Sequence, residues 1–225
     1  MRRAGELAPV ASGDVAPSDR RIQYWMLNGV SRVDDSALLR DRSTRYELTY
    51  MADRLVGSER PKAIGHRHPQ GHPEVCEVLN GRGGFLIQDL LPGPSASFAV
   101  LVEVGPGDRV VLPPWLFHTT LNLEGDPLVF SDVVDRAAGA DYRPVLEARG
   151  FAYFVMADGA VVPNPAYREV SGLIRVAALD WSGRWDEPLY TEFVRDGSAF
   201  DWLSDTTGFE ARFPEIWERV RRFVP

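Results

Sequence analysis

Short runs of alternating apolar and polar residues, separated by turn sequences, dominate the middle of the chain. This pattern predicts strands over residues 46–52, 75–79, 83–90, 98–104, 109–112, 116–123, 127–134, 151–156 and 160–162. Asn80-Gly81 and Asp158-Gly159 are typical of hairpins, and Gly105-Pro106-Gly107-Asp108 is a strong turn signal. Many short strands at roughly even spacing favour an all-β fold, either a barrel or a sandwich of the jelly-roll type.

The two ends of the chain have a different pattern. Residues 1–20 are rich in Ala, Pro, Gly, Ser and charged residues, so we expect a mobile leader. Residues 21–163 form the barrel, in which 21–39 packs on the outside as a short helix or strand. We expect residues 164–225 to wrap the barrel or cap a partner subunit. Helical periodicity is convincing only near its end, over 213–220 with a proline in the first turn.

Composition limits the classes of partner. A chain of 225 residues fits one domain with extensions, and its net charge of −7 provides no basic surface for nucleic acid. No apolar run approaches the ~18–20 residues of a membrane span, and the N-terminus lacks an apolar signal segment. The single cysteine, Cys76, excludes an internal disulfide and fits a reducing cytoplasm. We therefore expect a cytoplasmic enzyme that acts on a small molecule.

All four histidines of the chain lie in two segments, and three of them have the spacing of metal ligands. His66 and His68 are two residues apart, so on a strand both side chains leave the same face. Glu74 begins the next strand-like run, and His118 lies in a later one. Any one of these histidines would also fit a buried, hydrogen-bonded side chain. Three imidazoles and a carboxylate together predict one divalent transition metal, which can be Fe, Mn, Ni, Zn or Co.

The spacing of these residues resembles the two cupin motifs. The first motif is His66-x-His68, Glu74 and Gly81, and the second is Gly107, Pro113, His118 and Asn122. The long gap from His68 to Glu74, together with Gly139-x-Asp141-Tyr142 and Pro163-Asn164-Pro165-x-Tyr167, resembles the cupin-type glucose-6-phosphate isomerases. These are metal-dependent isomerases known mainly from archaea and some bacteria. The similarity covers about Tyr46 to Leu203 and implies a cupin jelly roll with an N-terminal extension and a C-terminal tail that ends in a helix.

The resemblance also implies roles for individual residues. The metal ligands would be His66, His68, Glu74 and His118, with Glu74 and Tyr142 as the catalytic residues. Substrate contacts would come from Thr49, Gly65 and Tyr142, and cupins commonly form homodimers. Two positions depart from the family pattern: Ala63 replaces a threonine that holds the phosphate, and Ala140 replaces a histidine.

Nearby cations are further candidates for a phosphate site. Lys62 and Arg60 precede the first histidine segment, and Arg82 lies in the turn after Asn80. We include Lys62 among the expected substrate-binding residues. Arg67 alternates away from the neighbouring histidines, so we expect its side chain to point out of the site.

The expected reaction is the interconversion of an aldose and a ketose. A divalent metal that holds two substrate oxygens stabilises an enediolate, and Glu74 can move the proton. A hydride shift, which needs no base, is an alternative. Ala63 and Ala140 leave open another metal cupin enzyme, either a dioxygenase or an isomerase or epimerase of an unphosphorylated substrate. A third alternative is a cupin that binds a ligand without catalysis. A linked DNA-binding segment would favour this alternative, and no such segment is visible in the sequence.

Overall fold

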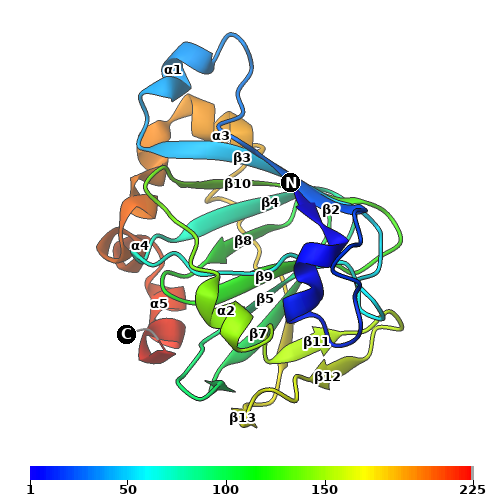
Figure 1. Cartoon of the computed structure of the whole chain (residues 1–225). Coiled ribbons are helices and arrows are strands. Elements are labelled where there is room, and N and C mark those ends of the chain that lie inside the picture. The colour runs from blue at the N-terminus through cyan, green and yellow to red at the C-terminus, as the bar shows by residue number, and fades with distance from the viewer. Residues whose placement is uncertain (224–225) are drawn as a thin grey trace.

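Two β-sheets packed face to face form the body of the protein (Figure 1). The computed structural model describes residues 1–223. The larger sheet has the order β1 (Arg2–Arg3), β2 (Ile22–Asn28), β3 (Thr44–Met51), β10 (Leu128–Asp135), β4 (Glu74–Asn80) and β8 (Arg109–Leu112). The smaller sheet has the order β14 (Ile174–Ala177), β7 (Ala99–Val104), β5 (Gly83–Gln88) and β9 (Phe117–Asn122). This is the jelly roll that the sequence predicted, and every predicted strand is present within two residues of its expected ends.

The turn at Asn80-Gly81 joins the two sheets and does not make a paired hairpin. β4 pairs with β10 and β8, whereas β5 pairs with β7 and β9. The chain reverses here because Gly81 has a φ of 79°, and a Cβ at this position would lie 2.7 Å from the carbonyl oxygen of Pro127. The turn sequence therefore predicted where the chain reverses. It did not predict the pairing, because β4 and β5 each pair with strands of their own sheet. The second predicted hairpin, β11 (Tyr153–Val155) with β12 (Val161–Pro163), is paired as expected.

The N-terminal segment differs from the expected mobile leader. β1 pairs with β2, and residues Ala4–Val10 form a 3₁₀ helix. Leu7 and Val10 are fully buried against the barrel core. They are three residues apart, which places them on one side of a helix with three residues per turn. The surrounding Ala, Pro and Gly residues hid this spacing in the sequence. Residues 21–39 contain both alternatives considered for them, the strand β2 and the start of the helix α1 (Ser36–Arg40).

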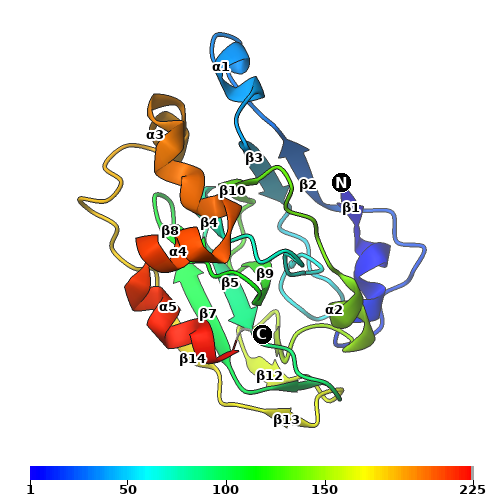
Figure 2. The same cartoon turned by 90° about the vertical axis from the view of Figure 1, so that its left-hand side faces the viewer.

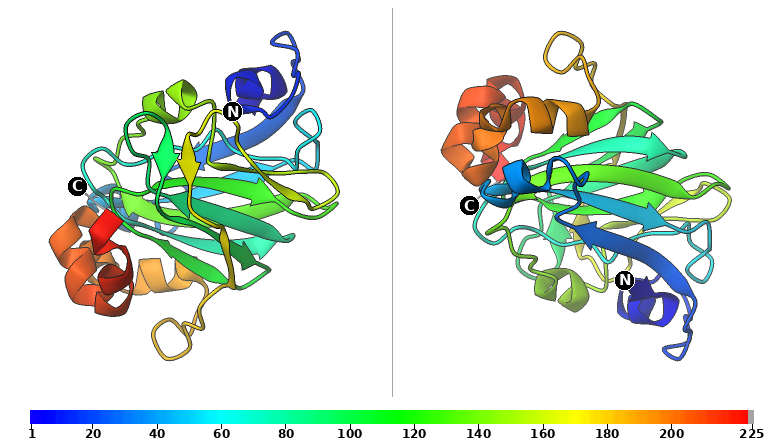
Figure 3. Two further views of the ribbon diagram at one scale, coloured as in Figure 1. Left: turned by 90° about the horizontal axis from the view of Figure 1, so that it is seen from below. Right: turned by 90° about the horizontal axis from the view of Figure 1, so that it is seen from above.

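In the C-terminal extension the helices pack on the outer face of the larger sheet, whereas β14 joins the edge of the smaller one (Figures 2 and 3). The extension contains β13 (Glu169–Val170), β14, α3 (Leu189–Arg195), a 3₁₀ helix over Gly197–Ser204, α4 (Thr206–Arg212), α5 (Pro214–Val220) and a last 3₁₀ turn over Arg221–Phe223. Of its helices only α5 was predicted, and it begins at the expected proline. Residues 224 and 225 of the predicted extension lie outside the described residues. No helix in residues 1–223 combines the length and apolar character needed to cross a membrane.

The strands β3, β10, β4 and β8 of the larger sheet are covered on both faces, and their residues alternate between two environments. Tyr46, Val75, Val111 and Val133 point outward into a cluster with the aromatic residues of the extension. The residues between them point inward, toward the smaller sheet, and line the cavity described below. The inner face carries Arg45, Glu47, Thr49, Glu74 and Asp132, so the sandwich encloses a polar site. Two short elements complete the barrel: β6 (Ser95–Ala96) pairs with β13, and α2 (Arg143–Glu147) lies near the N-terminal helix (Figure 1).

Candidate metal centre

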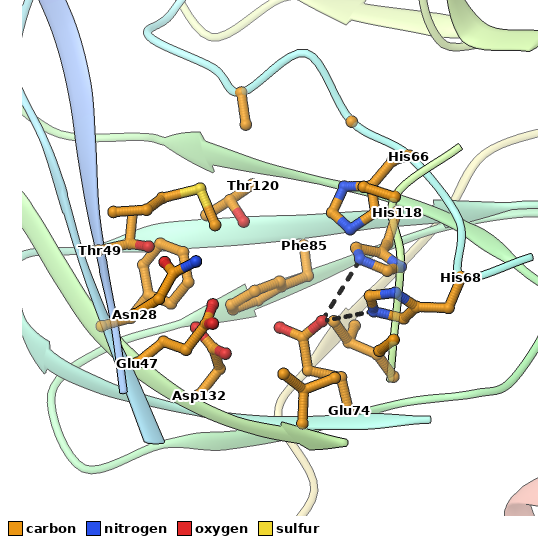
Figure 4. Close-up of a pocket in the computed structure, with 18 of the residues that line it drawn as sticks. Asn28, Glu47, Thr49, His66, His68, Glu74, Phe85, His118, Thr120 and Asp132 are labelled. Atoms are coloured by element: carbon orange, nitrogen blue, oxygen red, sulfur yellow. Dashed lines mark hydrogen bonds and ion pairs between the residues drawn. The ribbon is translucent and has the colours of Figure 1, made fainter. Parts of the chain in front are cut away.

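Four side chains from three parts of the barrel converge at one end of the inner cavity (Figure 4). His118 lies on β9, and Glu74 is the first residue of β4. His66 lies on the segment beside β9 and exchanges two backbone hydrogen bonds with His118, at 3.0 and 2.9 Å. One ligand atom from each of His66, His68, Glu74 and His118 lies within 4.8 Å of the others. The predicted ligand set is therefore brought together in space.

Gly65 allows the histidine segment to approach the barrel wall. Its φ is 81°, and a Cβ here would lie 2.2 Å from the ring of Phe151 and 2.8 Å from the Cβ of Thr119. No other residue type fits at this position without moving a buried neighbour. The tight approach puts His66 in register with His118, so the glycine positions the first ligand.

Hydrogen bonds orient the other ligands for a cation. The Nδ1 of His68 donates to the carbonyl oxygen of Gly139 at 2.7 Å, which leaves Nε2 as the free ligand atom, 3.1 Å from the Oε2 of Glu74. The Nε2 of His118 is 3.6 Å from the same oxygen. This nitrogen is buried and has no hydrogen-bond partner in residues 1–223. A metal ion between these atoms would satisfy it, so the donor set fits a divalent transition metal.

The environment keeps most of the ligands in the state that binds metal. Burial and the neighbouring imidazoles hold the pKa of His66 well below its usual value, and burial lowers the pKa of His118 to about 4. Burial alone would raise the pKa of Glu74, but the hydrogen bond from His68 and the nearby imidazoles lower it to about 2. For His68, burial disfavours the charged form, yet the hydrogen bond to Glu74 raises its pKa. His68 is therefore the ligand whose protonation competes most with metal binding.

A cavity of about 190 Å³ extends from the ligands into the barrel. Its walls include three of the residues expected at the substrate: Thr49, Gly65 and Tyr142. The ring of Tyr142 lies 5.3 Å from that of His66. Ala63 and Ala140, which depart from the family pattern, line the same cavity. The side chains expected near a substrate are thus gathered beside the ligands.

Lys62 does not line this cavity, which contradicts its expected role in binding substrate. Its ammonium group is buried and donates to Glu59 and to the carbonyl oxygen of Val10, both at 2.6 Å. Because Lys62 precedes the histidine segment in the sequence, we expected its side chain to lie near the metal ligands. Successive side chains of an extended segment point to opposite faces, and that of Lys62 points away from the cavity. Of the other two candidate cations, Arg82 pairs with Glu124 at the surface, and Arg60 lies on a different cavity.

Three charged residues in the cavity were missed from sequence: Arg45, Glu47 and Asp132. Arg45, Glu47 and the expected Thr49 follow one another at a spacing of two residues on β3, so their side chains lie on the same face of the strand. This spacing was the signal in the sequence that would have placed Arg45 and Glu47 in the cavity. Burial raises the pKa of Glu47 and, with the charges of Glu74 and Glu47, that of Asp132 well above its usual value. Asp132 lies on β10, so only the pairing of β10 with β3 reveals its position.

Comparisons with known proteins agree with this geometry. The family model described as glucose-6-phosphate isomerase (GPI) matches residues 1–171. A glucose-6-phosphate isomerase from Thermococcus gammatolerans is 31% identical over 132 residues, which are 57% of this chain and 67% of the relative. The enzyme of the same name from Thermococcus litoralis is 36% identical over 117 residues, 50% of this chain and 58% of the relative.

Among solved structures, an oxalate oxidase in complex with the substrate analogue glycolate matches 46% of this chain and 47% of its own, at 18% identity and a TM-score of 0.37. The family assignment depends on the sequence matches, because the family model covers residues 1–171, which is more than half of the chain. The chain therefore belongs to the glucose-6-phosphate isomerase family, and its jelly roll and histidine motifs make it one of the cupin-type enzymes of that family.

Proposed function

We propose that this protein is a divalent-metal-dependent aldose–ketose isomerase whose ion is bound by His66, His68, Glu74 and His118. The convergence of these four side chains beside an open cavity carries the proposal. Membership of the glucose-6-phosphate isomerase family supports the reaction type.

Each part of the reaction has a candidate in the cavity. When bound, a divalent ion would stabilise the negative charge that develops on the substrate oxygens during isomerisation. Glu74 is the proposed proton acceptor, and its two oxygens lie in different surroundings. Oε2 faces His68 and His118, whereas Oε1 accepts a hydrogen bond from the thiol of Cys76 at 3.2 Å. Burial raises the pKa of the Cys76 thiol well above its usual value, so it stays protonated and holds the carboxylate in place.

Tyr142 and Thr49 are the proposed substrate contacts in the cavity. Tyr142 lies beside His66, and the guanidinium of Arg2 lies 5.5 Å from its ring centroid. Thr49 lies on β3, further into the cavity, and Gly65 offers backbone next to the first ligand. These residues would orient the sugar so that its reacting carbons face Glu74.

The proposal is tested by metal analysis and an isomerase assay on the same preparation. The protein is purified without added metal, its ion is identified by anomalous scattering, and metal-free protein is reloaded in turn with Fe, Mn, Ni, Zn or Co. We expect one ion per chain and aldose–ketose interconversion that depends on it. Stoichiometric metal with O₂ consumption and no isomerisation would identify a dioxygenase instead and refute the proposal.

We also propose that the protein acts in the cytoplasm as a homodimer. β1 pairs only with the first residues of β2, so the rest of β2 has a free edge. Trp25 and Leu27 on this stretch are 39% and 59% exposed. Exposed apolar residues on a free edge favour pairing with another chain. Sedimentation equilibrium measures the molar mass directly, and a monomer at micromolar concentration would contradict the dimer.

A further inference from the structure

One end of the smaller sheet has an apolar face that stays open to solvent. In the strand register a single row crosses this sheet from β14 to β9, through Ile174, Val100, Ile87 and His118. His118 belongs to the metal centre inside the barrel, whereas Ile174 at the other end of the row is 54% exposed. The larger sheet ends at the short strand β8, and the apolar residues of β14 on this face remain uncovered.

A groove of about 360 Å³ lies at this uncovered end, between the sheet and the C-terminal helix α5 (Figure 2). Its apolar walls include four residues of the sheet and two of the helix: Val100, Val102, Ile174, Val176, Ile216 and Val220. Val176 and the nearby Leu179 are 41% and 51% exposed, so these walls are accessible to solvent. None of the described residues that line this α5 groove also lines the metal cavity, so the two sites are separate.

The charged residues that line the α5 groove within residues 1–223 are all arginines: Arg109, Arg219 and Arg222. Arg109 is neutralised by its buried ion pair with Glu77. Arg219 and Arg222 are exposed, and neither forms an ion pair with any residue in 1–223. The two acidic residues of α5 pair with other arginines. The groove therefore has a positive rim, although the whole chain has a net charge of −7.

Apolar walls with a positive rim suit an amphipathic anion. A hydrocarbon chain in the groove would remove the exposed Ile174, Val176 and Leu179 from water. Guanidinium groups bind carboxylates through paired, charge-assisted hydrogen bonds. The volume of the groove lies in the range of about 300–1,000 Å³ that is typical of small-molecule sites. A symmetric contact with a second copy of the chain is less favourable, because it would bring two positive rims together.

We propose that the α5 groove binds one long-chain carboxylate, with its hydrocarbon chain against β7 and β14 and its head group at Arg219 and Arg222. This assigns the protein a second ligand class, a free fatty acid, at a site away from the metal centre. The inference does not depend on the proposed isomerase activity, because the groove and the metal cavity have no lining residue in common within the described chain.

The first test varies the length of the hydrocarbon chain. Octanoate, decanoate and dodecanoate, each below its critical micelle concentration, are titrated calorimetrically into the full-length protein loaded with its native metal. We expect one site per chain. The dissociation constant should fall about fourfold for each added methylene group until the groove is full, because each buried methylene leaves water. An affinity that does not depend on chain length would overturn the inference.

The second test changes the charge of the head group and of the rim. Dodecyltrimethylammonium has the same chain with a positive head, and it should bind at least tenfold more weakly than dodecanoate. The net charge of −7 would favour the cation if binding were unspecific. Arg219→Gln/Arg222→Gln should weaken dodecanoate binding roughly tenfold. Arg40→Gln/Arg212→Gln is the control, because it removes two exposed charges outside the groove and should leave the affinity unchanged.

A third test blocks the groove itself. Val176→Glu places a negative charge on the groove wall at an exposed position, so the protein should fold normally and lose dodecanoate binding. Val162→Glu, on β12 and 36% exposed, is the matched control outside the groove and should bind as the wild type does. Sedimentation equilibrium of the same proteins tests the competing occupant. If Val176→Glu converts a wild-type dimer into a monomer and dodecanoate binds to neither, the groove is a contact between two copies and the inference is wrong. A wild type that binds no carboxylate, or binds the ammonium compound as tightly, would also refute it.

Discussion

At the scale of single residues, His118 gives the clearest test of the metal site. Its buried Nε2 has no protein partner in the described chain and faces Glu74. Replacing His118 with Ala removes one of four ligands, so we expect loss of stoichiometric metal after dialysis. His72 provides the control, because it is buried but hydrogen-bonds to the carbonyl oxygen of Leu203 at 3.3 Å and is not among the four converging ligands. His72→Asn should keep one ion per chain, and tight binding of an ion by His118→Ala would refute the ligand assignment.

The protonation of the ligands predicts how metal affinity depends on pH. The pKa of His66 is well below normal, that of His118 is about 4 and that of Glu74 about 2, so these three are already deprotonated near neutral pH. The hydrogen bond to Glu74 raises the pKa of His68, so this is the ligand that takes up a proton first as the pH falls. As the pH falls through the pKa of His68, metal binding should come to release about one proton, and below that pKa the affinity should fall about tenfold for each pH unit. Metal titrations at several pH values check the slope, and a release of two or three protons would contradict these ligand states.

The role of Glu74 in turnover can be separated from its role as a ligand. Glu74→Gln keeps the size and one ligating oxygen but cannot accept a proton. With three histidines remaining, the metal should still bind, although more weakly. If Glu74 moves the proton, kcat at saturating metal should fall about 100-fold or more. The wild type should also incorporate solvent deuterium at C2 of the sugar. Near-normal turnover of the variant without deuterium incorporation would indicate a hydride shift and leave Glu74 as a ligand only.

The residues predicted from sequence are those whose signal is local. His66, His68 and Glu74 lie close together in the chain, and a two-residue spacing on a strand is enough to place the two histidines on one face. Asp132 was missed because its place beside Glu47 depends on the pairing of strands that are far apart in sequence. Lys62 was misplaced for a similar reason. Its partners, Glu59 and the backbone of Val10, become neighbours only when the N-terminal helix packs on the barrel.

At the scale of elements, the strands were predicted well because a period of two is preserved along each of them. The short helices of the extension were not, since α3, the following 3₁₀ helix and α4 have seven or eight residues each, which is too short for a clear helical period. Their aromatic residues are buried among each other and against the sheet. This packing stabilises the short helices, and a local sequence pattern does not encode it.

The loop between His68 and Glu74 is attached to the C-terminal extension. The indole nitrogen of Trp115 donates to the hydroxyl of Thr206 at 3.0 Å, and this hydroxyl lies 3.4 Å from the carbonyl oxygen of Gly71. A Cβ on Gly71 would meet the Trp115 ring at 2.3 Å, so loop and indole are in close contact. The helix α4 thereby supports the loop that positions two metal ligands.

Thr206→Val should weaken metal binding without abolishing it. The variant keeps the shape but removes the hydroxyl between Trp115 and Gly71. A lost hydrogen bond of about 0.5–1.5 kcal/mol corresponds to an increase in the metal dissociation constant of roughly twofold to tenfold, if the loop uses this bond only in the metal-binding conformation. Thr206→Ser should restore the affinity of the wild type. Ser198→Ala, in the same extension but far from the loop in sequence and exposed, is the control. Equal affinity of Thr206→Val and the wild type would show that the loop needs no support from α4.

At the scale of the whole molecule, one buried ion pair connects the barrel to the extension. Glu77 on β4 and Arg109 on β8 are 5% and 7% exposed, and their side chains meet at 2.7 Å. Each also binds the backbone of the extension. Glu77 accepts from the amide of Leu189 at 2.9 Å, and Arg109 donates to the carbonyl oxygen of Trp185 at 2.9 Å. Glu77 lies on the outer face of the strand whose inner face carries Glu74, so this contact joins the extension to the strand of a metal ligand.

Removing Arg109 should therefore destabilise the whole protein as one unit. Arg109→Met leaves the Glu77 carboxylate buried without its counter-charge, which costs about 3–5 kcal/mol. Arg175→Met is the matched control, because Arg175 pairs with Glu103 at the surface, and its loss should cost less than about 1 kcal/mol. Urea unfolding should give coincident transitions by two probes, since both parts share one apolar cluster. The probes are tryptophan fluorescence, which reports mainly on the extension because four of the six tryptophans lie there, and far-ultraviolet circular dichroism. The double variant Glu77→Gln/Arg109→Met should recover part of the loss, because no charge remains unpaired. Separate transitions for the two probes in the wild type, or equal losses in Arg109→Met and Arg175→Met, would show that the extension folds independently of the barrel.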